Sequence, residues 1–146
     1  MTNYHQYHLN PINKSIHFAC IPLIVLTTIN FTSIINIPIP FIKKSIQLKN
    51  LLLLIYNFYY VRISWKVYFV MMCYFKTLIY ISQQWKKRDQ RWFSNSVKIF
   101  TLSWLLQFLG HYIEGNRPRL MDSITSAFFE APLFSLNYVI PMLTNK

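Results

Sequence analysis

The feature that most constrains this chain is the run of residues 18–41, which carries no charged side chain. A helix of about 20 residues crosses the roughly 30 Å of hydrocarbon in a bilayer. The run is long enough, and it ends at two prolines and a pair of lysines, which interrupt a helix and mark a membrane interface: Pro38, Pro40, Lys43 and Lys44. We therefore predict a membrane-spanning helix over residues 18–41.

The composition supports a bilayer as part of the solvent. Hydrophobic residues make up 53% of the 146 residues and charged residues 13%, against roughly 25% charged in an ordinary soluble domain. So apolar a chain leaves too little polar surface for a soluble monomer and too much apolar surface for disorder. Its length fits one domain, residues 1–146, and excludes a multidomain protein.

Four further spans are expected downstream. The apolar block 51–82 is interrupted by Arg62, Lys66 and Lys76, which favours two short tilted spans with a turn near residues 62–66. Residues 83–91 are expected to form a loop or an interfacial helix. A fourth span is predicted over 97–112 and a fifth over 124–143. The predicted fold class is all-α, a polytopic membrane bundle of about five transmembrane helices.

The net charge of +11 raises the question of nucleic-acid binding. However, the cations lie mostly at the edges of the apolar blocks, where membrane proteins place the residues that meet anionic lipid headgroups. The residues concerned are Lys43, Lys44, Lys49, Lys86, Lys87, Arg88, Arg91, Arg117 and Arg119. We therefore expect the lipid bilayer as a partner and no nucleic acid.

Several catalytic classes are excluded by missing residues. The zinc-protease pattern HExxH, the nucleophile elbow GxSxG and the glycine-rich phosphate and dinucleotide loops are all absent, and the chain has 2 glycines. Its 4 histidines are about half of what a histidine-rich membrane desaturase needs. Its two cysteines lie in apolar stretches and form neither a disulfide framework nor a zinc motif.

The histidines form the main candidate site. His5, His8 and His17 precede the first predicted span, and His111 ends the fourth. An even number of crossings between these regions brings them to the same membrane face, which four spans satisfy. His111 also shares a helical face with Glu114, three residues later. The set is a candidate metal site, with individually hydrogen-bonded interfacial histidines as the alternative.

Two long segments resemble a known family. The segment YHQYHLNPINKSIHFACIPL (residues 4–23) and the segment WLLQFLGHYIEGNRPRLMDSITSAFFEAPLF (residues 104–134) are similar to the paired signatures of the fungal 2-hydroxy-palmitic acid dioxygenase family and its bacterial relatives. The matching residues are His8, Pro11, Asn13, His17, Ile21, Pro22, Gln107, Gly110, His111, Pro118, Leu120, Asp122, Ala131 and Pro132. Cys20 and Arg119 depart from the pattern, each standing where the family has a smaller residue.

This resemblance implies an iron(II)-dependent membrane oxygenase of fatty acid α-oxidation. The family acts in degradation of the sphingolipid base phytosphingosine, in the endoplasmic reticulum of eukaryotes; a bacterial member would lie in the inner membrane. It implies a 2-hydroxy fatty acid and O2 as substrates, with a product one carbon shorter. The alternative is a non-catalytic membrane scaffold or lipid-binding protein with the family fold.

The resemblance also implies roles for particular residues. A 2-hydroxy acid that chelates iron through its hydroxyl and carboxylate, together with O2, leaves three of six positions for protein ligands, and His8, His17 and His111 match that number. His5 or Glu114 is the candidate for a further ligand. Asn13, Gln107 and Asp122 are candidates to orient the imidazoles, or else interhelical hydrogen-bonding residues. Arg117 is expected to pair with the substrate carboxylate, or else with a lipid headgroup.

Overall fold

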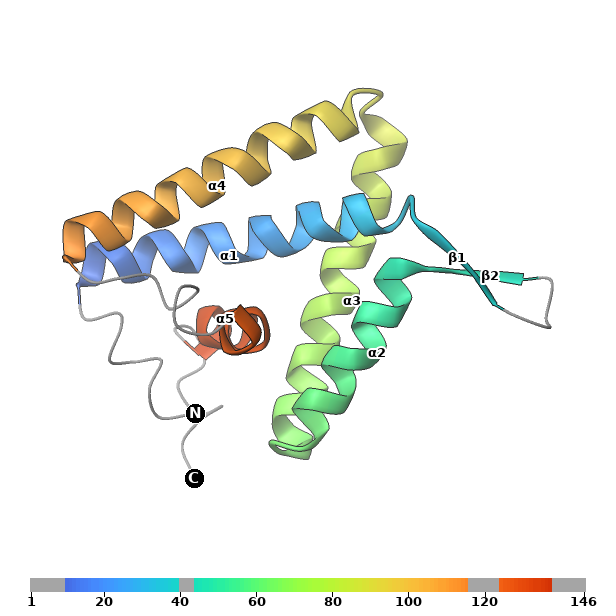
Figure 1. The fold of residues 1–146 in the computed structure, drawn as a ribbon, viewed down its shortest axis with the longest axis horizontal. Coiled ribbons are helices and arrows are strands. Elements are labelled where there is room, and N and C mark those ends of the chain that lie inside the picture. The colour runs from blue at the N-terminus through green and yellow to red at the C-terminus, as the bar shows by residue number, and fades with distance from the viewer. Residues whose placement is uncertain (1–9, 40–43, 116–123, 138–146) are drawn as a thin grey trace. The chain divides into compact units, whose positions relative to one another are not determined.

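The computed structural model describes residues 10–39, 44–115 and 124–137. Most of them are helical, in the order α1 (Pro11–Thr32), α2 (Leu48–Val61), α3 (Trp65–Arg88), α4 (Trp92–Glu114) and α5 (Ile124–Asn137) (Figure 1). One antiparallel hairpin lies between α1 and α2, with Asn36 of β1 (Asn36–Ile39) opposite Gln47 of β2 (Lys44–Gln47). The predicted helical fold is confirmed, whereas the all-α class missed this hairpin.

Helix α1 begins and ends earlier than the predicted span 18–41. It begins at Pro11 because the Asn10 side chain accepts a hydrogen bond from the Ile12 N–H at 2.8 Å, and proline suits a first helical position. It ends at Thr32, well before the prolines that were expected to stop it. The residues 34–39 that follow are rich in β-branched isoleucine, which favours extended backbone, and the last four of them form β1.

The apolar block 51–82 divides as predicted. Helix α2 ends at Val61 and α3 begins at Trp65, with Ser64 accepting a hydrogen bond from the Val67 N–H at 3.1 Å as the N-cap of α3. Aromatic side chains then hold the two helices side by side. The ring centre of Phe75 lies 5.0 Å from that of Tyr56 on α2. Arg62 therefore lies in the turn between the two helices, whereas Lys66 is in the first turn of α3 and Lys76 lies within that helix.

Residues 83–91, predicted as a loop or an interfacial helix, are mostly part of α3, which continues to Arg88. Cations in its last turn favour this extension because they complement the helix dipole. The connection to α4 is short because the Asp89 carboxylate reaches both helices. It accepts hydrogen bonds from Trp85 Nε1 at 2.9 Å and from Asn95 Nδ2 at 2.8 Å.

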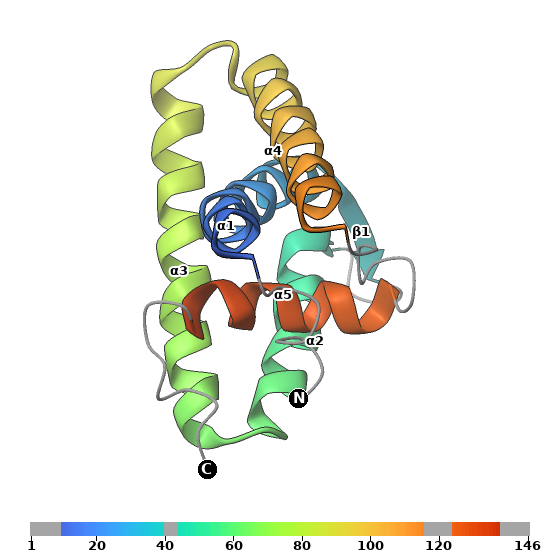
Figure 2. The ribbon, with the colours of Figure 1, turned by 90° about the vertical axis from the view of Figure 1, so that its left-hand side faces the viewer.

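The chain forms two compact units, Met1–Val25 with Lys98–Lys146, and Leu26–Val97. In the first unit, α5 crosses α1 and α4. Figure 1 shows α5 end-on while α1 and α4 lie in the plane of the picture, and Figure 2 shows α5 from the side. An apolar core joins α1 to α5, in which Ile21 and Phe134 are buried and Val25 and Ala131 pack against them.

In the second unit, a buried polar cluster connects α1, α3 and α4. Asn30 of α1 is fully buried; its Nδ2 donates to Ser96 Oγ of α4 at 2.9 Å, and its Oδ1 accepts from Ser82 Oγ of α3 at 2.5 Å. One side chain thus links three helices. Buried hydrogen bonds of this kind fix the register of helices that apolar contacts alone leave free to slide.

Replacing Asn30 with alanine is expected to destabilise the protein. The change removes two hydrogen bonds and leaves the hydroxyls of Ser82 and Ser96 buried, a cost of about 2–4 kcal/mol. Thermal unfolding of the detergent-purified protein, followed by tryptophan fluorescence, should show a Tm lower by about 5–10 °C. Asn50→Ala, at an exposed position of α2, is the matched control and should leave Tm nearly unchanged. Equal Tm values for both variants would contradict this role of Asn30.

Within the described residues, α1 is the one helix both long and apolar enough to cross a bilayer. Helices α2 and α5 have 14 residues each, fewer than the roughly 20 of a straight span. Helices α3 and α4 have the length but carry more polar residues. Of the predicted spans, the first therefore has support by length and composition.

Candidate functional site

The site is built where the N-terminal end of α1 meets the C-terminal end of α4. The Glu114 carboxylate accepts a hydrogen bond from the Asn10 N–H at 2.8 Å and another from Asn13 Nδ2. An anion is favoured there because the first N–H groups of a helix carry partial positive charge. Gly115, with φ of 73°, ends α4 directly after this residue. Glu114 therefore ties the two helix ends together.

A close approach of the helices accompanies this contact. Gly110 of α4 faces Asn13 and Ile16 of α1, and a Cβ added to it would overlap the Asn13 side-chain oxygen and lie 3.3 Å from Ile16 Cδ1. Asn13 is fully buried in the contact. Glycine is needed because any side chain would separate the helices or displace the amide that holds Glu114.

Gly110→Ala is therefore expected to lower stability and to loosen the site. The added methyl group must displace Asn13, which costs about 1–3 kcal/mol as an overpacked contact. The Tm should fall by several degrees, whereas Leu109→Ala, at the exposed neighbouring position, should change it less. A Gly110→Ala protein as stable as wild type, with the same crosslinking between cysteines placed on α1 and α4, would contradict the close approach.

Two histidines lie one to two turns inside this contact. The rings of His17 on α1 and His111 on α4 have their centres 4.9 Å apart and are nearly perpendicular, at 88°. Both residues are buried, with exposed fractions of 3% and 6%. The sequence places them at opposite ends of the chain, and they were related there through the number of crossings and through the family resemblance. The structure brings their rings into contact.

The orientation of His17 is fixed by its own helix. Its Nδ1 lies 3.1 Å from the backbone oxygen of Asn13, and because a carbonyl oxygen only accepts, Nδ1 must carry the proton. The other ring nitrogen, Nε2, is then the unprotonated one, which is the form that binds metal ions. A backbone carbonyl that holds one imidazole nitrogen while the other binds a metal is a recurrent arrangement in metal sites.

The spacing of the two rings fits a shared metal ion. Imidazoles that bind one ion through nitrogens about 2.1 Å away, at neighbouring coordination positions, place their ring centres about 4.6–5.3 Å apart. The observed 4.9 Å lies within this range. Among the described residues, no group of three or more histidine, cysteine or acidic side chains is close enough to hold a metal. A metal ion with three such ligands would therefore need a residue from outside them, and His5 and His8 both lie there.

Gln107 extends the polar face of α4 by one turn beyond His111. It is buried, with an exposed fraction of 7%, and its Nε2 has no hydrogen-bond partner among the described residues. One turn further, buried Ser103 makes a side-chain hydrogen bond with Cys20 of α1. Because its neighbours on both sides contact α1, Gln107 presents an amide donor to the space between the two helices.

The remaining predicted residues divide clearly. The structure brings together Asn13, His17, His111 and Glu114, with Gln107 on the same face of α4. His5, His8, Arg117 and Asp122 lie outside the described residues. Sequence reasoning gave no role to Asn10 or Gly110. The dipeptide Asn-Pro before an apolar run signals the start of a helix, so the capping role of Asn10 could have been predicted from the sequence. A single sequence gives no signal for which helix Gly110 faces.

Comparison with known families gives a match over almost the whole chain. A family model described as 2-hydroxy-palmitic acid dioxygenase Mpo1-like matches residues 1–143. The chain belongs to the Mpo1-like family. No curated protein and no solved structure matches it. The family description names a dioxygenase of a 2-hydroxy fatty acid, and the match includes both histidine regions from which the resemblance was drawn.

Proposed function

We propose that this Mpo1-like protein is a membrane-embedded, iron(II)-dependent dioxygenase that shortens 2-hydroxy fatty acids by one carbon. The observation that carries the proposal is the buried contact of His17 with His111, which lies inside the two segments that resemble the family's signatures. The family description supplies the substrate class. The buried histidine pair supplies two neutral ligands for a transition metal.

The proposed roles follow from the contacts. His17 and His111 hold the iron together with His8, and His5 is a further candidate. Asn13 orients His17 through its backbone oxygen, and Glu114 holds Asn13 and the start of α1 in place. Gln107 donates its free amide hydrogens to the substrate or to a ligand of the iron. Arg117 is proposed to bind the substrate carboxylate and Asp122 to orient an imidazole.

When bound, iron(II) supplies the electron transfer to O2 and coordination positions for the hydroxyl and carboxylate of the acid. The protein's part is to hold neutral imidazoles, to bind the carboxylate and to exclude water. The reaction balances without a further reductant, because a 2-hydroxy acid and O2 give the shortened acid, CO2 and water. The electrons that reduce O2 come from the two carbons that are oxidised.

Embedding in a membrane is supported by the distribution of side chains on α4. Its buried positions are polar, with Ser103, Gln107 and His111 facing inward. Along residues 102–113 its exposed positions are large and apolar: Leu102, Leu105, Leu106, Phe108, Leu109, Tyr112 and Ile113. This arrangement is the reverse of that in a helix of a soluble protein. The mean hydropathy of the whole helix does not reveal it, because the mean combines the two faces. An acyl chain reaching the site from the bilayer would pass along such a surface.

Iron content tests the proposal. The full-length protein, purified in detergent and loaded with ferrous iron without oxygen, is expected to retain nearly one iron per chain by elemental analysis. Absence of bound metal after loading would contradict the oxygenase and favour the non-catalytic scaffold or lipid-binding protein. O2 consumption with 2-hydroxypalmitate then tests the activity of the loaded protein.

A further inference from the structure

The turn between α3 and α4 concentrates cations beside tryptophans. We call Lys86, Lys87, Arg88 and Arg91, with Trp85 and Trp92, the basic turn. Lys87, Arg88 and Arg91 are exposed. None of the proposed iron chemistry uses these residues. So dense a group of like charges raises the question of which anion balances it.

The protein does not supply that anion within the unit Leu26–Val97. Asp89 is the one acidic residue in this part of the sequence, and its carboxylate is already engaged by Trp85, Asn95 and the Arg91 N–H. Hydrogen bonds from Asn95 and Trp85 hold the pKa of the Asp89 carboxyl below its ordinary value, so it is ionised and committed to the turn. The four cations of the basic turn thus outnumber its one carboxylate, and the net positive charge favours an external anion.

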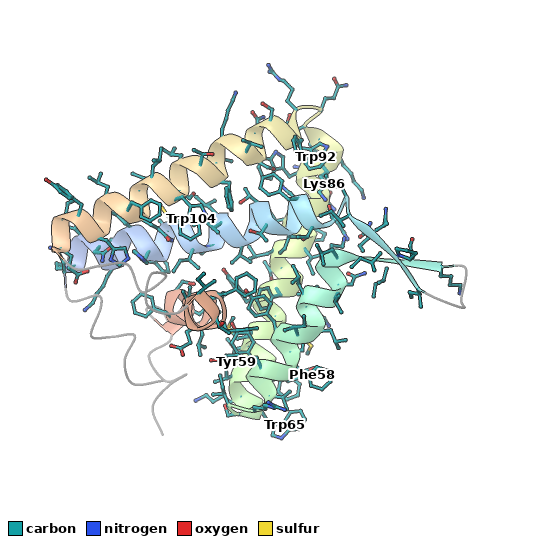
Figure 3. The ribbon with its side chains drawn as sticks, in the orientation of Figure 1. Phe58, Tyr59, Trp65, Lys86, Trp92 and Trp104 are labelled. Atoms are coloured by element: carbon teal, nitrogen blue, oxygen red, sulfur yellow. The ribbon has the colours of Figure 1, made fainter. Side chains whose placement is uncertain are left out.

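Lys86 lies where it can take part in binding an external anion. Its Nζ donates to Ser33 Oγ and lies 5.1 Å from the centre of the Trp92 ring. Figure 3 shows the two labelled side chains near the connection between α3 and α4. Burial and the charge of Lys49 lower the pKa of Lys86, so a second cation from α2 acts on the same place. An anion between them would relieve that repulsion.

The surroundings favour a lipid over a nucleic acid. Large apolar side chains are exposed within two or three turns of the basic turn on both helices: Tyr80 and Ile81 on α3, Phe93 and Val97 on α4. A nucleic acid would leave these side chains in water. Cations and tryptophans next to exposed apolar residues are typical of the boundary between headgroups and acyl chains.

We propose that the basic turn binds the phosphate headgroups of anionic phospholipids. The proposal rests on the membrane embedding of the proposed function and is independent of the iron chemistry. It adds a lipid-headgroup site to the catalytic one, built from different residues. The phosphate accepts hydrogen bonds from the exposed cations, and the tryptophans hold the turn at headgroup depth.

The test compares two variants of equal charge. The full-length protein is mixed with equal amounts of phosphatidylglycerol and phosphatidylcholine in detergent, purified again, and its retained lipids are measured by mass spectrometry. Wild type should retain phosphatidylglycerol at least fivefold over phosphatidylcholine. The variant Lys87→Gln, Arg88→Gln, Arg91→Gln should lose most of that preference, since each cation near an anionic surface contributes about fivefold.

The matched control removes three exposed cations from the same unit, Arg62→Gln, Lys66→Gln and Lys76→Gln, and should keep the preference. Equal losses in both variants, or no preference in wild type, would overturn the proposal. Loss of the preference in the presence of millimolar inorganic phosphate, or retention of a DNA duplex in place of lipid, would also overturn it. Recovery of the protein without any lipid would likewise overturn the headgroup site, whereas iron content tests the oxygenase separately.

Discussion

Alanine in place of His17 or His111 is expected to abolish iron retention and to lower O2 consumption with 2-hydroxypalmitate by at least a hundredfold. Each ring lies buried against the other, 4.9 Å between centres, so removal of either leaves the remaining ligands too few to hold iron(II). Elemental analysis of the purified protein and an oxygen electrode measure the two effects. His8→Ala is expected to behave alike.

The control variant separates loss of a ligand from loss of structure. Ser103→Ala removes a buried polar group from the same face of α4, two turns from His111, and should keep both iron and activity. His5→Ala distinguishes three protein ligands from four, because retained iron in that variant supports the set of three. If His17→Ala and His111→Ala proteins that unfold at the wild-type temperature still held one iron per chain, the histidine site would be wrong.

The helices were predictable where the sequence interrupts its own apolar pattern. Cations at Arg62 and Lys66 predicted the division of the block 51–82 because a charge inside a span is costly, and the turn is found there. The limits of α1 were not found, because the apolar run continues through residues 34–39. Hydropathy does not distinguish an apolar helix from an apolar strand, and the β-branched isoleucines decided for the strand.

The site was predictable only as a set of residues. Counting crossings placed His17 and His111 on one side of a membrane, and the resemblance marked both as ligands. Neither argument gives a distance, which depends on how closely α1 and α4 approach. That approach depends on Gly110 and Asn13, and on Glu114 holding the helix ends. Glu114 was expected on a shared face with His111 as a reserve ligand, whereas its carboxylate is hydrogen-bonded to Asn10 and Asn13.

The second large effect expected is a requirement for the 2-hydroxyl group of the substrate. Palmitate in place of 2-hydroxypalmitate should reduce O2 consumption at least a hundredfold, because palmitate lacks the hydroxyl that closes a five-membered chelate ring on the iron, and its carbon next to the carboxylate is not yet oxidised. Wild-type protein, supplied with 2-hydroxypalmitate and no reductant, should consume one O2 for each acid shortened. The oxygen electrode and mass spectrometry of the fatty acids measure both quantities.

Inhibition by palmitate provides the matched comparison for this requirement. If the acyl chain lies along the apolar side chains of the helices and the carboxylate meets Arg117, palmitate should compete with 2-hydroxypalmitate although it is not turned over. Competition without turnover would show that the acyl chain and carboxylate of the substrate provide binding, whereas the 2-hydroxyl group is needed for the reaction. Gln107→Leu, which removes the free amide donor and keeps an apolar side chain of similar size, should lower activity while leaving iron content unchanged. Equal turnover of both acids, or a need for added reductant, would contradict chelation and the balanced reaction on which the proposed function rests.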